Sequence, residues 1–191
     1  MMPPPRVAEH AHARRSTPTQ VSKLALLTPT VLSLTGFFVL LALSNGALQD
    51  FGVVSLMATQ GLTLSSANVA LTAYLLFAAL GVLAGGSLAD RTQRHGEVSA
   101  AGYALAALMV LAMATISLPA PVLAICMGSA GFLIGMMMPS RDMLVRKAAP
   151  PGAAGRVFGI VSTGFNIGGT IGPLIFGWIM DRGAPQWVFG V

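Results

Sequence analysis

The sequence predicts an all-α membrane protein, a polytopic bundle of about five transmembrane helices with the start of a sixth. Three observations support this fold class. Of the 191 residues, 54% are hydrophobic and only 9% are charged, whereas a soluble globular domain carries about 25% charged residues. Long stretches contain no Asp, Glu, Lys or Arg, and the basic residues gather between alternate stretches. Lipid is the medium that tolerates so apolar a surface.

The uncharged stretches predict the individual helices. A helix that crosses the hydrocarbon needs roughly 20 apolar residues, and its backbone hydrogen bonds are satisfied internally. Four stretches are long enough: 24–49, 51–89, 98–140 and 157–180. The third holds two helices because Pro119 and Pro121 make a turn at its middle. The expected spans are 30–57, 67–88, 98–118, 121–140 and 157–180, and 187–191 is expected to begin a sixth helix.

The basic residues predict the orientation of the chain. Only Arg182 lies on one side of the expected spans, and the other ten of the eleven Lys and Arg residues lie on the opposite side. These ten are Arg6, Arg14, Arg15, Lys23, Arg91, Arg94, Arg141, Arg146, Lys147 and Arg156. The positive-inside rule then places the N-terminus in the cytoplasm, and we expect an integral protein of a bacterial plasma (inner) membrane. The net charge of +5 reflects this orientation, so no nucleic-acid partner is expected.

The first 22 residues are expected to form a disordered cytoplasmic tail. His10 and His12 lie in this tail without other ligands nearby, so no metal site is predicted there. Cys126, the single cysteine, lies in an apolar run and is expected to be a small buried side chain. No cofactor is expected anywhere in the chain.

The most specific motif lies between the second and third expected spans. Residues 85–96, Gly-Gly-Ser-Leu-Ala-Asp-Arg-Thr-Gln-Arg-His-Gly, resemble the cytoplasmic signature loop of the major facilitator superfamily, G-x-x-x-D-[RK]-x-G-R-[RK]. The matching residues are Gly86, Asp90, Arg91 and Arg94. Gln93 replaces the usual Gly, and His95 replaces the last basic residue. We call residues 85–96 the switch loop.

The resemblance implies that the switch loop stabilises one of two alternating conformations. Gly86 is expected to let the helix end approach a neighbouring helix closely. Asp90 can pair with basic groups or cap an adjacent helix N-terminus, and the arginines hold the loop at the cytoplasmic face. The alternative reading is an ordinary charged turn.

The resemblance extends over about residues 28–191 and implies that 23–191 form a transmembrane helical half-domain. The run is similar to helices seven to eleven, the C-terminal half, of a branch that includes fosmidomycin-resistance-type efflux proteins. The segments 81–90, 138–143 and 164–168 carry this resemblance. The N-terminal half is the alternative, because the two halves of such transporters are repeats that share signals.

Glycines spaced by four residues predict close packing of helices. Residues four apart lie on one helix face, and small residues there let two backbones approach. The expected packing residues are Gly81, Gly85, Gly131, Gly135, Gly164, Gly168, Gly172 and Pro173. The last of these resemble a Gly-x-x-x-Gly-Pro pattern that the family's antiporters carry in their fifth helix. Because this helix is placed as the eleventh, antiport does not follow.

Polar side chains within the spans are the candidate substrate or proton groups, because such groups are costly in lipid. Asn45 and Gln49 share a face of the first helix, and Asp50 is the only acid in an expected span. Asp50 is either a proton site or a hydrated group near the outer interface. Tyr74 and Asn166 are weaker candidates, and Asn166 could equally hydrogen-bond a neighbouring helix.

The sequence therefore predicts part of a secondary active transporter that moves a small organic solute or drug by alternating access and is inactive without its missing half. The expected partners are membrane lipid, an unknown small-molecule substrate, and a separate N-terminal half or a second copy. The alternative is a truncated membrane protein with only a packing or interaction role. An enzyme is disfavoured, because no His lies in an expected span and Asp50 has no acidic partner for intramembrane catalysis.

Overall fold

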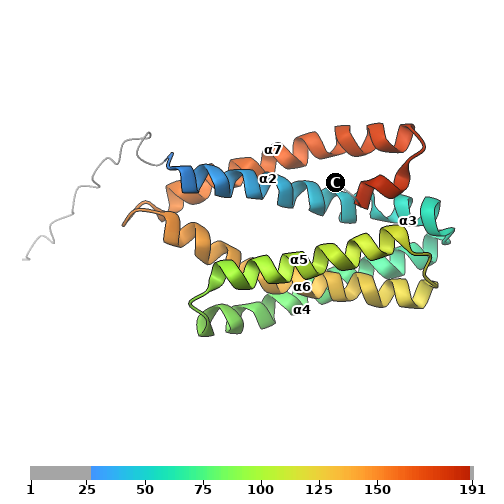
Figure 1. Cartoon of the computed structure of the whole chain (residues 1–191), viewed down its shortest axis with the longest axis horizontal. Helices are drawn as coiled ribbons and strands as arrows, with labels where there is room; N and C mark the ends of the chain where they lie inside the picture. Colours follow the sequence, from blue (N-terminus) through green and yellow to red (C-terminus); the bar gives the residue numbers. More distant parts are fainter. Residues whose placement is uncertain (1–26, 190–191) are drawn as a thin grey trace, which may run out of the picture.

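The computed structural model describes residues 27–189, which form six α-helices and one short 3-10 helix (Figure 1). The helices are α2 (Pro29–Gln49), α3 (Gly52–Gln60), α4 (Leu64–Arg91), α5 (His95–Thr115), α6 (Ala120–Ala148), α7 (Ala154–Asp181) and η1 (Pro185–Phe189). Within this described range there is no β-strand. The tail expected over 1–22 lies outside the described residues.

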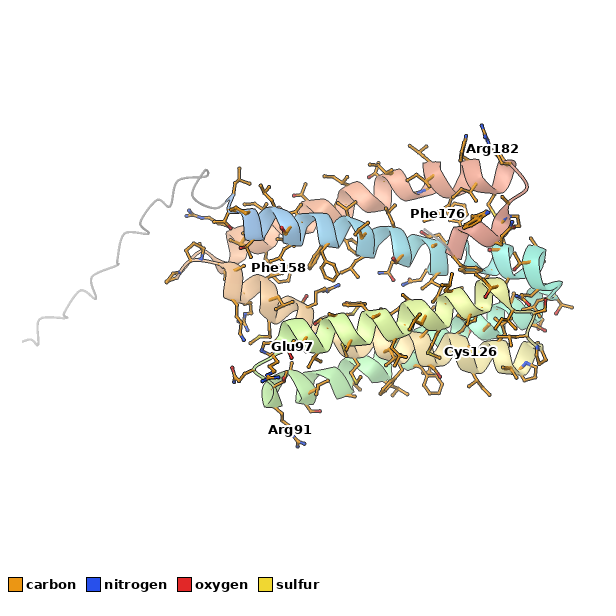
Figure 2. The ribbon with its side chains drawn as sticks, viewed as in Figure 1. Arg91, Glu97, Cys126, Phe158, Phe176 and Arg182 are labelled. Carbon is orange, nitrogen blue, oxygen red and sulfur yellow. The ribbon has the colours of Figure 1, made fainter. Side chains whose placement is uncertain are left out.

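Five of the helices are long and apolar enough to cross a membrane, namely α2, α4, α5, α6 and α7. They alternate in direction, so the turns between them collect at two ends (Figure 1). The start of α2, the α4–α5 turn and the α6–α7 turn share one end, which we call the basic end. Its turns and helix ends carry Arg91, Arg94, Arg146, Lys147 and Arg156. Arg182 lies at the opposite, far end (Figure 2). The predicted all-α membrane bundle is confirmed.

The first expected span, 30–57, is two helices. The break lies at Asp50 and Phe51, whose N–H groups both donate to the Gly46 carbonyl at 3.0 and 3.2 Å. Beyond the break, the Phe51 ring packs on Phe176 of α7 with centroids 5.5 Å apart. Ser55 Oγ donates to the Pro185 carbonyl at 2.8 Å, across 130 positions of sequence. These long-range contacts turn α3 over the far end of the bundle.

The far end is closed by α3 and η1. Residues 185–189 form a 3-10 helix rather than the α-helix expected over 187–191, and positions 190 and 191 lie outside the described residues. Gln60, at the end of α3, holds the α5–α6 turn. Its Nε2 donates to the carbonyls of Met113 and Ile116 at 3.0 and 3.1 Å, and its Oε1 accepts from Leu118 N at 3.1 Å. One side chain thereby satisfies backbone groups at the end of α5 and in the turn.

At the basic end, four helices extend at least three residues beyond the expected spans. α4 continues to Arg91, α5 begins at His95, α6 continues to Ala148 with Pro139 inside it, and α7 begins at Ala154. The last turns of α4 and α6 carry basic side chains, which the negative end of a helix dipole stabilises. Charged residues therefore mark the edge of the apolar segment without ending the helix.

Glycines on both helices mediate the contact between α4 and α6. A Cβ at Gly81 or Gly85 would overlap the α6 main chain at Phe132 or Met136, respectively. Reciprocally, a Cβ at Gly131 or Gly135 would overlap the α4 main chain at Tyr74 or Ala78. The four glycines thus form one interface in which backbone packs on backbone.

A second pair, α2 and α7, packs in the same way. Gly164 and Gly168 of α7 lie against the main chain of Thr35 and Val39 on α2. Gly172 is packed less tightly, because a Cβ there would meet only the side chains of Phe176 and Leu43 at 3.4 and 3.6 Å. Pro173 lies inside α7, which continues to Asp181.

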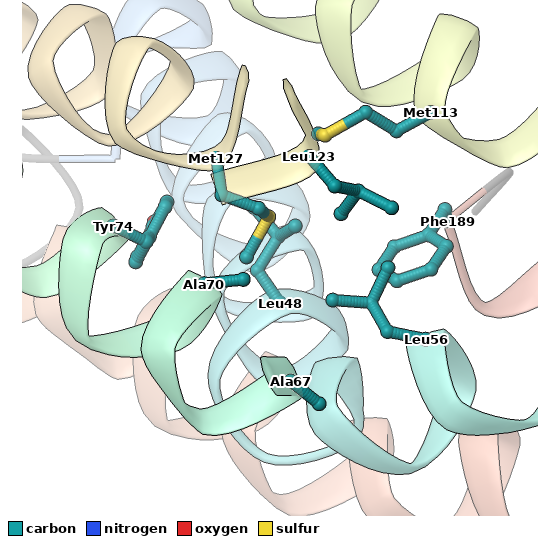
Figure 3. Close-up of a cluster of buried hydrophobic side chains, with 9 residues drawn as sticks. All are labelled: Leu48, Leu56, Ala67, Ala70, Tyr74, Met113, Leu123, Met127 and Phe189. Carbon is teal, nitrogen blue, oxygen red and sulfur yellow. The ribbon is translucent and has the colours of Figure 1, made fainter. Parts of the chain in front are cut away.

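The helices therefore form two groups, α2 with α7 and α4 with α5 and α6, which lie side by side along their length (Figure 1). At the far end they share a cluster of buried side chains drawn from α2, α3, α4, α5, α6 and η1 (Figure 3). At the basic end a second cluster joins Val31 and Phe38 of α2 to Val145 of α6 and Val157 of α7. Between these two clusters the groups separate.

We predict that Gly135→Ala destabilises the chain, because the added methyl group would overlap the Ala78 main chain. The free energy of unfolding in detergent should fall by about 1–3 kcal/mol, followed by the fluorescence of Trp178 and Trp187. Gly169→Ala is the matched control, since nothing lies within 4 Å of its added Cβ. That change should leave stability unchanged or raise it by up to about 1 kcal/mol. Equal effects of the two changes would contradict the glycine interface.

Candidate functional site

A cavity of about 410 Å³ lies between the two helix groups. Its walls come from α2, α4, α5, α6 and η1, and most of its lining side chains are apolar. The polar side chains that line it are Ser44, Asn45, Tyr74, Tyr103 and Arg141. A mostly apolar cavity of this size with a few polar groups is typical of a small-molecule site.

Three of the predicted polar residues lie together at this cavity. Gln49 Nε2 donates to Asn45 Oδ1 at 2.8 Å, and the Tyr74 hydroxyl reaches the same oxygen at 3.5 Å. Asn45 and Tyr74 line the cavity, and Tyr74 is only 1% exposed. Because Asn45 Oδ1 is engaged by two donors, its amide N–H groups are the part of this side chain available to a solute.

Arg141 brings a positive charge to the cavity wall. Its side chain is 13% exposed, and its Nε and Nη2 atoms both lie 3.0 Å from Asp142 Oδ1. The guanidinium also lies over the Phe38 ring, 4.7 Å from the centroid, a favourable cation–π arrangement. The charge is therefore balanced within the protein.

Sequence reasoning missed Arg141 and Tyr103 as cavity residues. Arg141 follows the expected end of the span 121–140, so the sequence predicts only an orienting charge there. Because α6 continues to Ala148, Arg141 instead lies within a helix, beside the cavity. A local pattern predicts that this arginine can be buried. In the run Pro139-Ser140-Arg141-Asp142, the adjacent opposite charge of Asp142 can balance that of Arg141.

Two other predicted residues lie away from the cavity. Asp50 is exposed at the C-cap of α2 and does not line the cavity. Asn166 is exposed on α7, where its backbone carbonyl accepts a hydrogen bond from Thr170 Oγ1 at 2.8 Å. The tertiary structure thus groups Asn45, Gln49 and Tyr74 and leaves these two residues apart.

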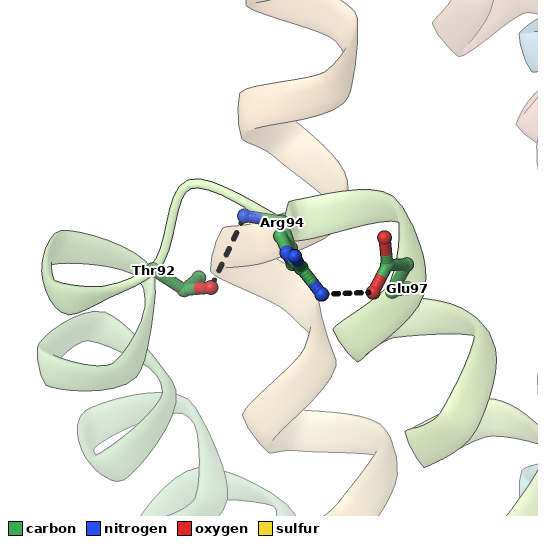
Figure 4. Close-up of polar contacts among 3 residues, drawn as sticks. All are labelled: Thr92, Arg94 and Glu97. Carbon is green, nitrogen blue, oxygen red and sulfur yellow. Dashed lines mark hydrogen bonds and ion pairs between the residues drawn. The ribbon is translucent and has the colours of Figure 1, made fainter.

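The switch loop is held by local hydrogen bonds and one bond to α6. Thr92 Oγ1 accepts from Arg94 N at 3.2 Å, and Arg94 pairs with Glu97 at 3.4 Å (Figure 4). Lys147 Nζ donates to the Gln93 carbonyl at 3.3 Å. This last bond ties the loop to the end of α6.

The motif residues Gly86 and Asp90 face a hollow at the basic end. It is lined also by Pro139, Asp142 and Arg146 of α6 and by Phe158 of α7. A Cβ at Gly86 would meet nothing within 4 Å, so the close approach expected of Gly86 is made by Gly85 instead. Among the described residues, Asp90 forms no ion pair in this conformation.

The described helices hold no cluster of three His, Cys, Asp or Glu side chains that could bind a metal ion.

A family model described as the Major Facilitator Superfamily matches residues 24–191. That range includes the five apolar helices, the cavity and the switch loop. No curated protein matches the chain.

We predict that Asp142→Asn lowers the free energy of unfolding by about 1–2 kcal/mol. The change leaves the Arg141 guanidinium, 13% exposed, without its compensating charge. Glu97→Gln is the control, because its pair with Arg94 is 78% and 73% exposed and should contribute at most about 0.5 kcal/mol. Chemical denaturation in detergent measures both variants. A loss for Glu97→Gln as large as that for Asp142→Asn would show that burial of Arg141 is not the cause.

Proposed function

Because the chain belongs to the major facilitator superfamily, we propose that it forms part of a secondary active transporter, which moves a small organic solute or drug across the membrane by alternating access. The chain is an integral membrane protein whose helices contact lipid. The observation that carries the proposal is the cavity between two separately packed helix groups, with Asn45, Tyr74 and Arg141 in its wall. This arrangement provides both a place for a solute and elements that can move around it.

The cavity wall supports recognition of a small organic solute. Its lining is mostly aliphatic and aromatic, which suits an apolar or aromatic body. The Asn45 amide and the Tyr103 hydroxyl can hydrogen-bond polar atoms of the solute. Arg141 contributes a charge that Asp142 already balances, so the site does not require an ionic solute.

The packing supports movement by relative displacement of the two groups. Backbone-to-backbone contacts at glycines hold α4 against α6 and α2 against α7. Between the groups, fewer contacts join α6 to α2 and α7. The switch loop lies at the basic end of this boundary, and Asp90 is free to pair with a basic group when the groups shift. In this proposal Gly86, Asp90, Arg91 and Arg94 control the conformation and do not contact the solute.

Polar side chains on the outer face of α7 support the proposal that further helices pack against this face. Thr163, Asn166 and Thr170 are exposed there at helical spacing. The two threonine hydroxyls donate to carbonyls of α7 itself, whereas lipid offers the Asn166 side-chain amide no hydrogen bond. A separate half of the transporter or a second copy would cover this face. We assign the described helices to the C-terminal half, as helices seven to eleven, of an efflux-type member.

The asymmetry of basic residues supports a cytoplasmic basic end in a bacterial plasma membrane.

In a Cys126→Ala background, we predict that Ser65→Cys is labelled by an impermeant thiol reagent added outside intact cells. Gln93→Cys should react only after permeabilisation, because it lies in the turn at the basic end. Both positions are exposed in the structure. The reverse labelling pattern would invert the proposed topology.

Flux measurements test the proposed function. We predict that the chain alone in liposomes moves none of a panel of radiolabelled small organic solutes faster than empty vesicles do. Together with a six-helix N-terminal half, it should transport at least one of them, because alternating access needs both cavity walls. Asn45→Leu should weaken solute binding, whereas Asp90→Asn should slow transport at unchanged solute affinity.

Ser87→Ala is the control, since Ser87 is exposed on α4 and bonds only its own helix. Flux by the chain alone that is lost on Asn45→Leu would mean that the helices already form a complete transporter. Absence of flux in both preparations would count against transport and favour a packing role.

A further inference from the structure

The interface of α5 and α6 contains buried polar atoms that the protein does not satisfy. Among the described residues, His95 Nδ1, Ser99 Oγ, Tyr103 Oη and Ser140 Oγ are buried and have no hydrogen-bond partner. His95 and Ser99 are each 3% exposed, and Ser140 is fully buried. An unpaired buried polar group costs about 1–3 kcal/mol, and nearly all such groups in proteins have a partner. Three of them, His95, Ser99 and Ser140, lie where α5 packs on α6, and the fourth, Tyr103, lines the adjoining cavity.

The register of the two helices places Ser99 opposite Ser140. A Cβ at Gly102 would overlap the Met137 side chain, and one at Gly96 would lie 3.9 Å from the Leu144 side chain. Because α5 and α6 are antiparallel, the position midway between the two glycines faces the position midway between Met137 and Leu144. The two serine hydroxyls therefore lie at the same level of the interface.

The polar atoms form a line from the basic end to the cavity. His95, Ser99 and Tyr103 follow at a spacing of four residues, which places them on one face of α5. His95 begins α5 next to the switch-loop turn, and Tyr103 lines the cavity together with Arg141. At about 1.5 Å per residue, each step along α5 is about 6 Å. A single water molecule that makes two hydrogen bonds of about 2.8 Å bridges such a step.

We propose that the α5–α6 interface holds a chain of ordered water that carries protons between the basic end and the cavity, with His95 as its entry group. Hydroxyl groups and water both donate and accept hydrogen bonds, so they can pass a proton along the line. Histidine is the side chain that exchanges protons near neutral pH. Its ring accepts a proton at one nitrogen and releases one from the other, which leaves His95 as the other neutral tautomer. A turn of the ring then restores the starting form before the next proton passes.

The ion pairs at this end of the bundle form among the neighbours of His95 and do not include it. The charged groups at this end are Asp90 and Arg91 on α4, Arg94 before α5, Glu97 on α5, Asp142, Arg146 and Lys147 on α6, and Arg156 on α7. Glu97 pairs with Arg94, and Asp142 pairs with Arg141. Within the described part of the chain, no carboxylate forms an ion pair with His95.

The proton path replaces Asp50 as the coupling element, and it rests on the proposed function only for its destination, the solute cavity. Asp50 is exposed at the far end and does not line the cavity. The path instead uses groups inside the bundle that open at the basic end. The coupling ion of the transporter would then be the proton.

Hydrogen–deuterium exchange of a buried thiol tests the path with a probe the size of a proton. In the full chain with Cys126→Ala, in lipid nanodiscs, infrared spectroscopy follows the S–H band of Ser140→Cys after transfer to D₂O. Exchange should be at least about tenfold faster than for Met127→Cys, which places the thiol in the buried apolar cluster on the same helix. Adding His95→Leu should slow exchange at position 140 to the Met127→Cys rate, whereas adding Glu97→Gln should not.

Slow exchange at position 140, equal to that at position 127, would show a dry interface and overturn the proposal. Fast exchange at position 140 that persists when His95→Leu is added would show that protons do not enter through His95. Circular dichroism and gel filtration identify folded variants, and Ser99→Cys on the facing helix replaces Ser140→Cys if the latter does not fold. The measurement needs no transport, so its outcome and the outcome of the flux experiment are independent.

Discussion

The close approach of helix backbones at glycine is the interaction on which the rest of this structure depends. In lipid, helices gain little from burying apolar side chains against one another, because lipid tails are equally apolar. Association then relies on van der Waals contact between main chains, which requires residues without a Cβ. Gly81, Gly85, Gly131 and Gly135 meet this requirement between α4 and α6, and Gly164 and Gly168 meet it between α2 and α7. These contacts decide which helices pair, and so divide the bundle into two groups.

The division into two groups creates the cavity. Where α2 faces α5, larger side chains such as Phe37, Leu40 and Leu111 line the space and the backbones stay apart. The groups meet mainly near their ends, through the cluster around Leu48 and Leu56 and the cluster around Phe38 and Val145. A bundle that is rigid within each group and joined mainly at its ends can hold a solute in its middle and still change shape. The cavity between the two groups therefore follows from where glycine is placed.

Polar side chains inside the bundle have three different kinds of surroundings. Gln60 is satisfied by backbone groups of the α5–α6 turn, and Arg141 is balanced by Asp142. The line of His95, Ser99 and Ser140 has no partner among the described residues. Polar groups are costly in lipid, and the first two arrangements lower that cost. The third arrangement is the one on which the proposed proton path rests. The same physical argument that locates structural hydrogen bonds thus also locates the candidate proton path.

The sequence by itself determined the class of fold, the number of apolar helices and the end at which basic residues gather. These properties depend on composition within about 20 consecutive residues, which is the thickness of the hydrocarbon core. It also placed Asn45, Gln49 and Tyr74 among the candidates that prove to lie together at or beside the cavity. Only the tertiary structure decided that Asp50 and Asn166 lie elsewhere, that Arg141 and Tyr103 line the cavity, and that α3 breaks away after Gln49. Those outcomes depend on contacts between distant segments, such as Ser55 with Pro185 and Gly102 with Met137, and no local pattern specifies which segments will meet.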